Sequence, residues 1–63
     1  MGKLDMQEVF YGCYYVRGGL IIRKAFTKKY KAVFYVLRNH SRADFVEGWL
    51  ERGFENKEEH FYE

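Results

Sequence analysis

Catalytic chemistry in this chain would have to come from one cysteine and two histidines. Cys13 lies in the middle of a β-prone run with no histidine near it in sequence, which is typical of a small apolar filler. His40 stands beside Ser41 at an expected helix start, and its spacing to His60 matches no metal-binding motif. No glycine-rich loop opens a helix in the manner of a phosphate-binding loop. We therefore predict no enzymatic activity, no metal site and no cofactor.

The chemistry that the sequence does favour is the binding of an anion. From Val9 to Ala43 the chain has eight Lys and Arg, eight Phe and Tyr, and no Asp or Glu. Nucleic acid requires cations that follow its phosphates, and single strands also stack their bases on flat rings. We predict a non-enzymatic nucleic-acid-binding or regulatory module, for DNA or RNA, with these binding residues: Arg17, Lys24, Lys28, Lys29, Lys31, Tyr11, Tyr15, Phe26 and Tyr35.

Two other interpretations of this surface stay open. The rings could be cross-strand pairs that stabilise a small sheet, and the lysines could keep its edges soluble. An exposed aromatic face would also suit a second protein chain, because Tyr and Arg are enriched at binding hot spots. The competing function is a protein-interaction module, either a homodimer or an inhibitor or accessory factor for an acidic protein. It would use the aromatic sheet face or an acidic helix.

Charge divides the chain into a basic part and an acidic part. Residues 1–43 carry nine Lys and Arg against two acids, a net +7, while residues 44–63 carry two against seven, a net −5. The two parts could attract each other in the fold, but exposed ion pairs contribute only about 0–1 kcal/mol each. Alternatively, the basic part docks on phosphates and the acidic part repels nucleic acid from the remaining surface.

Length and composition predict one small domain. The chain has 63 residues, of which 48% are apolar and 21% aromatic, enough for one compact core. A single cysteine cannot form an internal disulfide, and the N-terminal residues lack the apolar run of a signal peptide. Lys and Arg interrupt every apolar segment well before the ~20 residues that span a bilayer. We expect a cytoplasmic protein that does not insert into membranes.

Three strands and one helix are predicted to position the basic residues. We expect a loose arm over 1–7, strands over 8–17, 20–27 and 30–38, a helix over 41–54 and an acidic tail over 55–63. Gly18-Gly19 is typical of a tight hairpin turn, which requires positive φ, and Lys28-Lys29 is the expected second turn. Ser41 is a suitable N-cap for a helix with apolar residues at helical spacing: Val46, Trp49, Leu50, Gly53 and Phe54.

The expected fold is an α+β domain, a three-stranded antiparallel sheet (β-β-β-α) with one C-terminal amphipathic helix packed on one face. Two-residue turns would place Arg23 on the helix side of the sheet and Lys24 on the outward side. The helix, with Trp49 at the centre of the core, would sit above a trough of small residues: Gly12, Ala25 and Ala32. This element order is similar to that of the arm-binding domains of phage-type integrases, a likeness of architecture that favours DNA binding.

Overall fold

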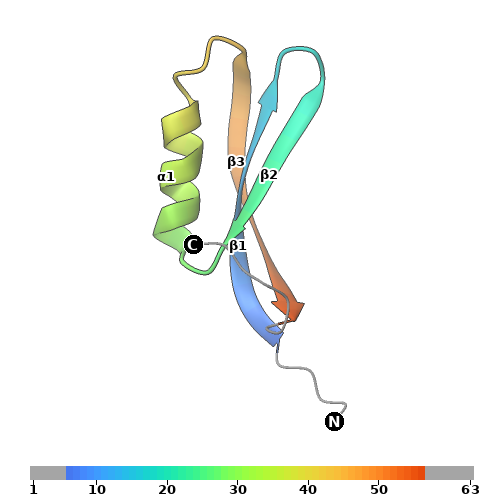
Figure 1. Ribbon diagram of the computed structural model, residues 1–63, viewed down its shortest axis with the longest axis vertical. Helices are drawn as coiled ribbons and strands as arrows, with labels where there is room; N and C mark the ends of the chain where they lie inside the picture. The colour runs from blue at the N-terminus through green and yellow to red at the C-terminus, as the bar shows by residue number, and fades with distance from the viewer. Residues whose placement is uncertain (1–5, 57–63) are drawn as a thin grey trace.

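The computed structural model describes residues 6–56 as a small α+β fold. Its three antiparallel strands have the order β2-β1-β3, and α1 lies along one face of this sheet (Figure 1). Most of the expected arm and acidic tail fall outside the described residues. No helix within residues 6–56 is long and apolar enough to cross a membrane. The elements are β1 (Met6–Val16), β2 (Leu20–Phe26), α1 (Lys29–Asn39) and β3 (Phe45–Asn56).

The predicted β-β-β-α order is wrong, because the helix lies between the second and third strands. Residues 30–38, expected as a strand, belong to α1, and most of 41–54, expected as a helix, belongs to β3. The order is therefore β-β-α-β, and the likeness to integrase arm-binding domains loses its basis. Ala32 is the buried residue of α1, and three residues of intermediate exposure follow it at i+3, i+4 and i+7: Tyr35, Val36 and Asn39.

Close contact with α1 explains why β3 contains a glycine at its centre. A Cβ on Gly48 would lie 2.5 Å from Val36 Cγ1, which is too close for any side chain there. Gly48 therefore faces α1, and because strand residues alternate between faces, its neighbours Glu47 and Trp49 face the other way. The prediction that Trp49 lies on a helix at the centre of the core is therefore wrong.

The Gly18-Gly19 hairpin is confirmed, with φ angles of +106° and +96°. Its turn, however, has three residues, because β2 begins at Leu20 and Leu20 pairs with Val16. The expected two-residue turn would have paired Leu20 with Arg17. A shift of one residue exchanges the two faces of a strand, so Lys24 lies on the helix side and Arg23 on the outward side, the reverse of the prediction.

The core forms where α1 crosses β1 at Gly12. A Cβ on Gly12 would lie 2.7 Å from the carbonyl oxygen of Ala32, and Ala32 itself is fully buried. Tyr14, the next β1 residue on this face, has 3% of its surface exposed and contacts the Tyr35 ring at 5.9 Å between centroids. Gly12 is thus the point at which the sequence allows helix and sheet backbones to touch, but the expected trough of small residues is not present, because Ala32 belongs to α1 and Ala25, paired with Tyr11, lies on the other face of the sheet.

Replacing Gly12 with alanine should destabilise the fold by about 1–3 kcal/mol, because the added methyl group would overpack against backbone that cannot move aside. Gly53→Ala is the matched control, since its Cβ would meet only the edge of the Tyr11 ring, at 3.1 Å. Urea unfolding followed by circular dichroism measures both. Equal midpoints for Gly12→Ala and the wild type would mean that α1 does not sit at Gly12.

Candidate nucleic-acid interface

Four cations line the contact between α1 and β2. Neither element, nor the turn between them, contains an Asp or Glu. Lys31, Tyr35 and Arg38 stand at i, i+4 and i+7, so they share one stripe of α1. The Tyr35 ring in this stripe packs against Phe26 of β2, with 5.5 Å between ring centroids. We call the cations along this contact the basic seam: Lys24, Lys28, Lys31 and Arg38.

Lys24 occupies the middle of the basic seam. Its Nζ lies 5.6 Å from the ring centroid of Phe26, on its own strand, and 5.6 Å from that of Tyr35, on α1. Cation–π contacts at exposed sites are worth about 0.5–1 kcal/mol. These contacts hold the ammonium group above the two rings while the side chain stays exposed. The ammonium group of Lys24 can therefore bind an anion without any rearrangement of the core.

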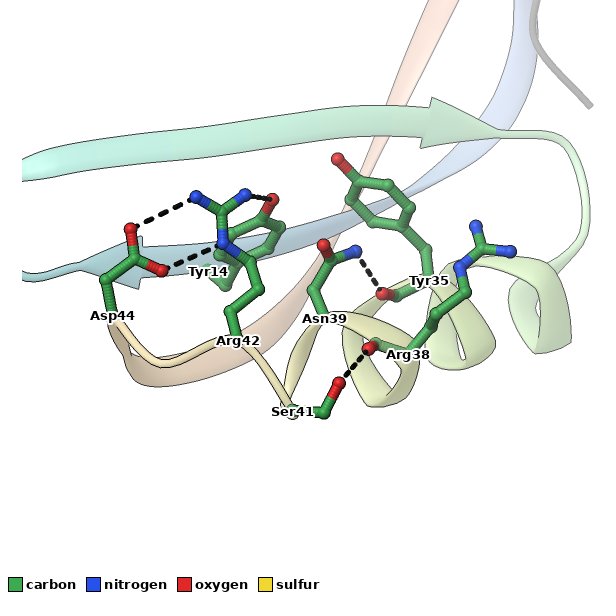
Figure 2. Close-up of polar contacts among 7 residues, drawn as sticks. All are labelled: Tyr14, Tyr35, Arg38, Asn39, Ser41, Arg42 and Asp44. Carbon is green, nitrogen blue, oxygen red and sulfur yellow. Dashed lines mark hydrogen bonds and ion pairs between the residues drawn. The ribbon is translucent and has the colours of Figure 1, made fainter.

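Tyr35 links the basic seam to Tyr14 beneath the helix. Its side chain extends from α1 toward β2 (Figure 2). Burial raises the pKa of Tyr35, and the neighbouring Tyr14 raises it further, while the positive charges of Arg38 and Arg42 oppose that rise. Both guanidinium groups therefore lie near enough to the Tyr35 phenol to act on its ionisation.

Arg42 is not part of the basic seam, because its charge is already compensated. Its Nε and Nη2 donate to the two carboxylate oxygens of Asp44 at 2.9 and 3.1 Å, and Nη1 donates to the Tyr14 hydroxyl at 3.1 Å (Figure 2). The hydrogen bond from Arg42 lowers the pKa of Asp44, so this carboxylate stays ionised. The pair marks the end of the acid-free region at the start of β3.

The first turn of α1 carries an excess of positive charge. Lys28 is the N-cap residue and makes no side-chain cap bond, and no acidic residue follows it in the first turn. The free N–H groups of a helix N-terminus already bear partial positive charge, so Lys28 and Lys29 are unfavourably placed there. An anion bound at this end of the seam would relieve the repulsion.

The predicted cations are mostly brought together. Arg17 is separated from the others: it follows β1 at the hairpin, and its backbone N–H donates to the carbonyl oxygen of Asp44 at 2.8 Å. Sequence reasoning missed Arg38, because 30–38 was taken as a strand. Its helical spacing from Lys31 and Tyr35 was the available signal. Three of the five predicted cations belong to the basic seam, namely Lys24, Lys28 and Lys31. A fourth, Lys29, directly follows Lys28 in the sequence.

The predicted rings do not join these cations as a stacking surface. Phe26 has 5% of its surface exposed, and Tyr35 is half-buried between α1 and β2. Tyr11 and Tyr15 alternate with Gly12 and Tyr14 along β1 and so lie on the sheet face away from α1. Bases could not stack on Phe26 without unpacking the core, and the rings of Tyr11 and Tyr15 lie on the opposite face of the sheet from α1.

The sheet face away from α1, which we call the open face, is acidic. Arg23 lies on it and pairs with β3, not with a helix carboxylate: Nη2 donates to Glu51 Oε1 at 2.6 Å, and Cζ lies 4.9 Å from the Tyr11 centroid. The Tyr11 hydroxyl donates to a carboxylate oxygen of Glu55. A phosphate approaching Tyr11 or Tyr15 would meet carboxylates that β3 presents at every fourth residue: Glu47, Glu51 and Glu55.

The candidate catalytic residues are not assembled into a site in the part of the chain that the structure describes. Cys13 is buried, and burial raises the pKa of its thiol, which makes it a poor nucleophile. The His40 ring packs on Phe45 with 4.6 Å between centroids, and His60 lies outside the described residues. Among residues 6–56, no three His, Cys, Asp or Glu side chains group as metal ligands.

Comparison with protein-family models, with curated proteins and with solved structures finds no match for this chain. A function for the basic seam is therefore argued from its geometry and charge.

Tyr11 should lose its proton at unusually high pH. Its hydrogen bond to Glu55, with burial and the carboxylate charge, raises the pKa of Tyr11 from 10.0 to about 12. The unfolded chain therefore releases this proton first, so the contribution to stability is complete below pH 10 and is lost as the pH rises through about 12. Absorbance titration of tyrosinate should lose its latest phase in Tyr11→Phe and keep it in Tyr15→Phe. Identical titrations for both variants would contradict the assignment.

Cys13 should react slowly with a thiol reagent in the folded protein. It is 1% exposed and lies between Arg23 on β2 and Trp49 on β3 in the strand pairing. Trp49→Ala should remove part of this cover and speed labelling, whereas Phe34→Ala, on the far side of α1, should not. The measurement is the rate at which the thiol reagent labels Cys13 under native conditions, followed by the chromophore that the reagent releases. Fast labelling of the wild type would show that the open face does not shield this thiol.

Proposed function

We propose that this protein is a non-enzymatic module that binds nucleic acid through the sugar–phosphate backbone. The observation that carries the proposal is the basic seam, in which Lys24, Lys28, Lys31 and Arg38 follow the contact of two elements without a carboxylate. The acids of the described chain lie at the start of β1, beside Arg42 and along β3. The molecule therefore offers one side to phosphates and repels them from the open face.

The length of the basic seam suits several phosphates. Lys31 and Arg38 are seven residues apart, about 10 Å along the helix axis. Duplex DNA carries one charge per about 1.7 Å of its axis, so a seam of this length faces more than one phosphate on each strand. Four contacts would make the logarithm of affinity fall with the logarithm of salt concentration with a slope of about −3 to −4.

Recognition by this surface would depend little on base sequence. Of the rings nearest to the seam, Phe26 is buried in the core, and Tyr35 is half-buried and packs against Phe26. Phosphate contacts position a protein but carry no sequence information by themselves. We infer a preference for duplex or structured nucleic acid over flexible single strands. A single unpaired cysteine fits a reducing compartment, so we place this function in the cytoplasm.

The competing function, a protein-interaction module that uses the sheet face or an acidic helix, has less support in this form. The one helix of the described residues is basic, since its charged side chains are Lys29, Lys31 and Arg38. On the open face, Tyr11 and Arg23 are already engaged by carboxylates of β3. Surface for a protein partner lies elsewhere, on the outer side of α1.

Replacing Lys24 and Lys28 with glutamine should weaken binding to a mixed-sequence duplex and reduce its salt slope by about 2, because each lost phosphate contact removes about 1. Fluorescence anisotropy of a labelled duplex across a salt series measures both quantities. Arg52→Gln is the matched control, since this cation is 68% exposed, pairs with Glu8, and lies on β3, which is separated from β2 by β1.

The double variant should unfold close to the wild-type midpoint, because exposed charges contribute little to stability. Absence of duplex binding by the wild type at low salt would refute the proposal. If Arg52→Gln weakened duplex binding as much as Lys24→Gln, binding would depend on the overall positive charge and not on the basic seam.

A further inference from the structure

The outer side of α1 exposes three large apolar side chains in one stripe. Tyr30, Phe34 and Leu37 are 54%, 61% and 59% exposed, and they stand at i, i+4 and i+7. Ala32, which faces the sheet, is fully buried, so this stripe lies on the side of the helix turned away from the core. We call these three residues the outer stripe. The helix therefore has two apolar sides, and residues 6–56 cover only one of them.

The outer stripe is an ordered surface. The Tyr30 and Phe34 rings meet edge to face, with 6.0 Å between centroids and 73° between planes. Leu37 adds an aliphatic side chain one turn further on. Residues spaced in this way form a ridge that packs into the grooves of a second helix. Solvent-exposed apolar clusters of this kind mark interaction sites more often than single exposed residues do.

The charges beside the outer stripe decide what can cover it. Every charged residue of α1 is a cation, namely Lys29, Lys31 and Arg38, and no carboxylate lies between Val9 and Ala43. A second copy docked through its own α1 would bring like charges together on both flanks, which is unfavourable. A partner with carboxylates on its flanks would instead find a complementary cation on each side.

We propose that the outer stripe binds an acidic amphipathic helix of a partner protein. The partner would insert apolar residues at i, i+3 or i+4, and i+7 between Tyr30, Phe34 and Leu37. Its Glu or Asp residues would pair with Lys29 on one flank and with Arg38 on the other. The two helices would pack ridge into groove. The inference goes beyond nucleic-acid binding, because it depends on apolar residues that play no part in the basic seam.

The test is binding of a synthetic, fluorescein-labelled amphipathic helical peptide with leucines along one side and glutamates along both flanks. Phe34→Ser and Leu37→Ser should each weaken its affinity about tenfold, the loss expected for one large apolar contact. Ile21→Ser is the matched control: Ile21 is 57% exposed on β2, outside the stripe, and its replacement should leave affinity within about twofold. Replacing the peptide glutamates with glutamine should also weaken binding.

Several results would overturn this inference. One is the absence of saturable binding up to about 1 mM peptide, the weakest affinity of interest. Another is equal binding of a scrambled peptide. Sedimentation that shows a dimer dispersed by Phe34→Ser would assign the stripe to a second copy, and binding to anionic lipid vesicles but not to peptide would assign it to a membrane surface. Lys24→Gln separates the two proposals, since it should weaken duplex binding but not peptide binding.

Discussion

The close packing of α1 against Gly12 determines how the other surfaces of this molecule are arranged. The carbonyl oxygen of Ala32 lies so close to this glycine that a single methyl group could not be added between them. With Ala32 held against β1, the rotation of the helix is determined. Tyr35 then points toward β2, Val36 toward Gly48 of β3, and the outer stripe toward solvent. Both candidate binding surfaces follow from this one contact between backbone atoms.

Charge separation contributes little to holding the fold together. The described ion pairs join exposed side chains, such as Arg23 with Glu51, whose side chains are 54% and 38% exposed. Pairs of this kind are worth about 0–1 kcal/mol and are screened by salt. Lys24 instead lies over the rings of Phe26 and Tyr35. Pairs of this strength do not by themselves explain why the sequence is bipolar.

The sequence predicted the composition of the basic surface better than its geometry. Strand propensity dominated the interpretation of residues 30–38, because they are rich in Val, Phe and Tyr, yet propensity is a weak guide where tertiary packing decides. The helical spacing of Ala32, Tyr35 and Val36 was present but competed with a strand pattern. In 41–54 the opposite error arose. There Gly48 and Gly53, each costing a helix about 1 kcal/mol, were the evidence against the helix.

Turn length decided the faces of β2, and this could not be read from Gly18-Gly19 alone. Two glycines with positive φ fit a two-residue or a three-residue turn, and the choice between them exchanges Arg23 and Lys24. The cations therefore could be predicted as a set, whereas their division between the basic seam and the open face could not. The positions of the aromatic rings were harder to predict, because a ring such as Phe26 can lie in a core or on a surface, and only the register decides between the two.

The two proposed surfaces share a cation, and this has a consequence for regulation. Arg38 belongs to the basic seam and also flanks the outer stripe, since it lies on α1 between its inner and outer sides. A carboxylate paired with Arg38 removes a contact that phosphate would use. Binding of an acidic helix and of nucleic acid would therefore oppose each other, and by linkage each must weaken the other by the same factor. An acidic partner helix would then act as an electrostatic competitor of nucleic acid without touching Lys24 at the centre of the seam.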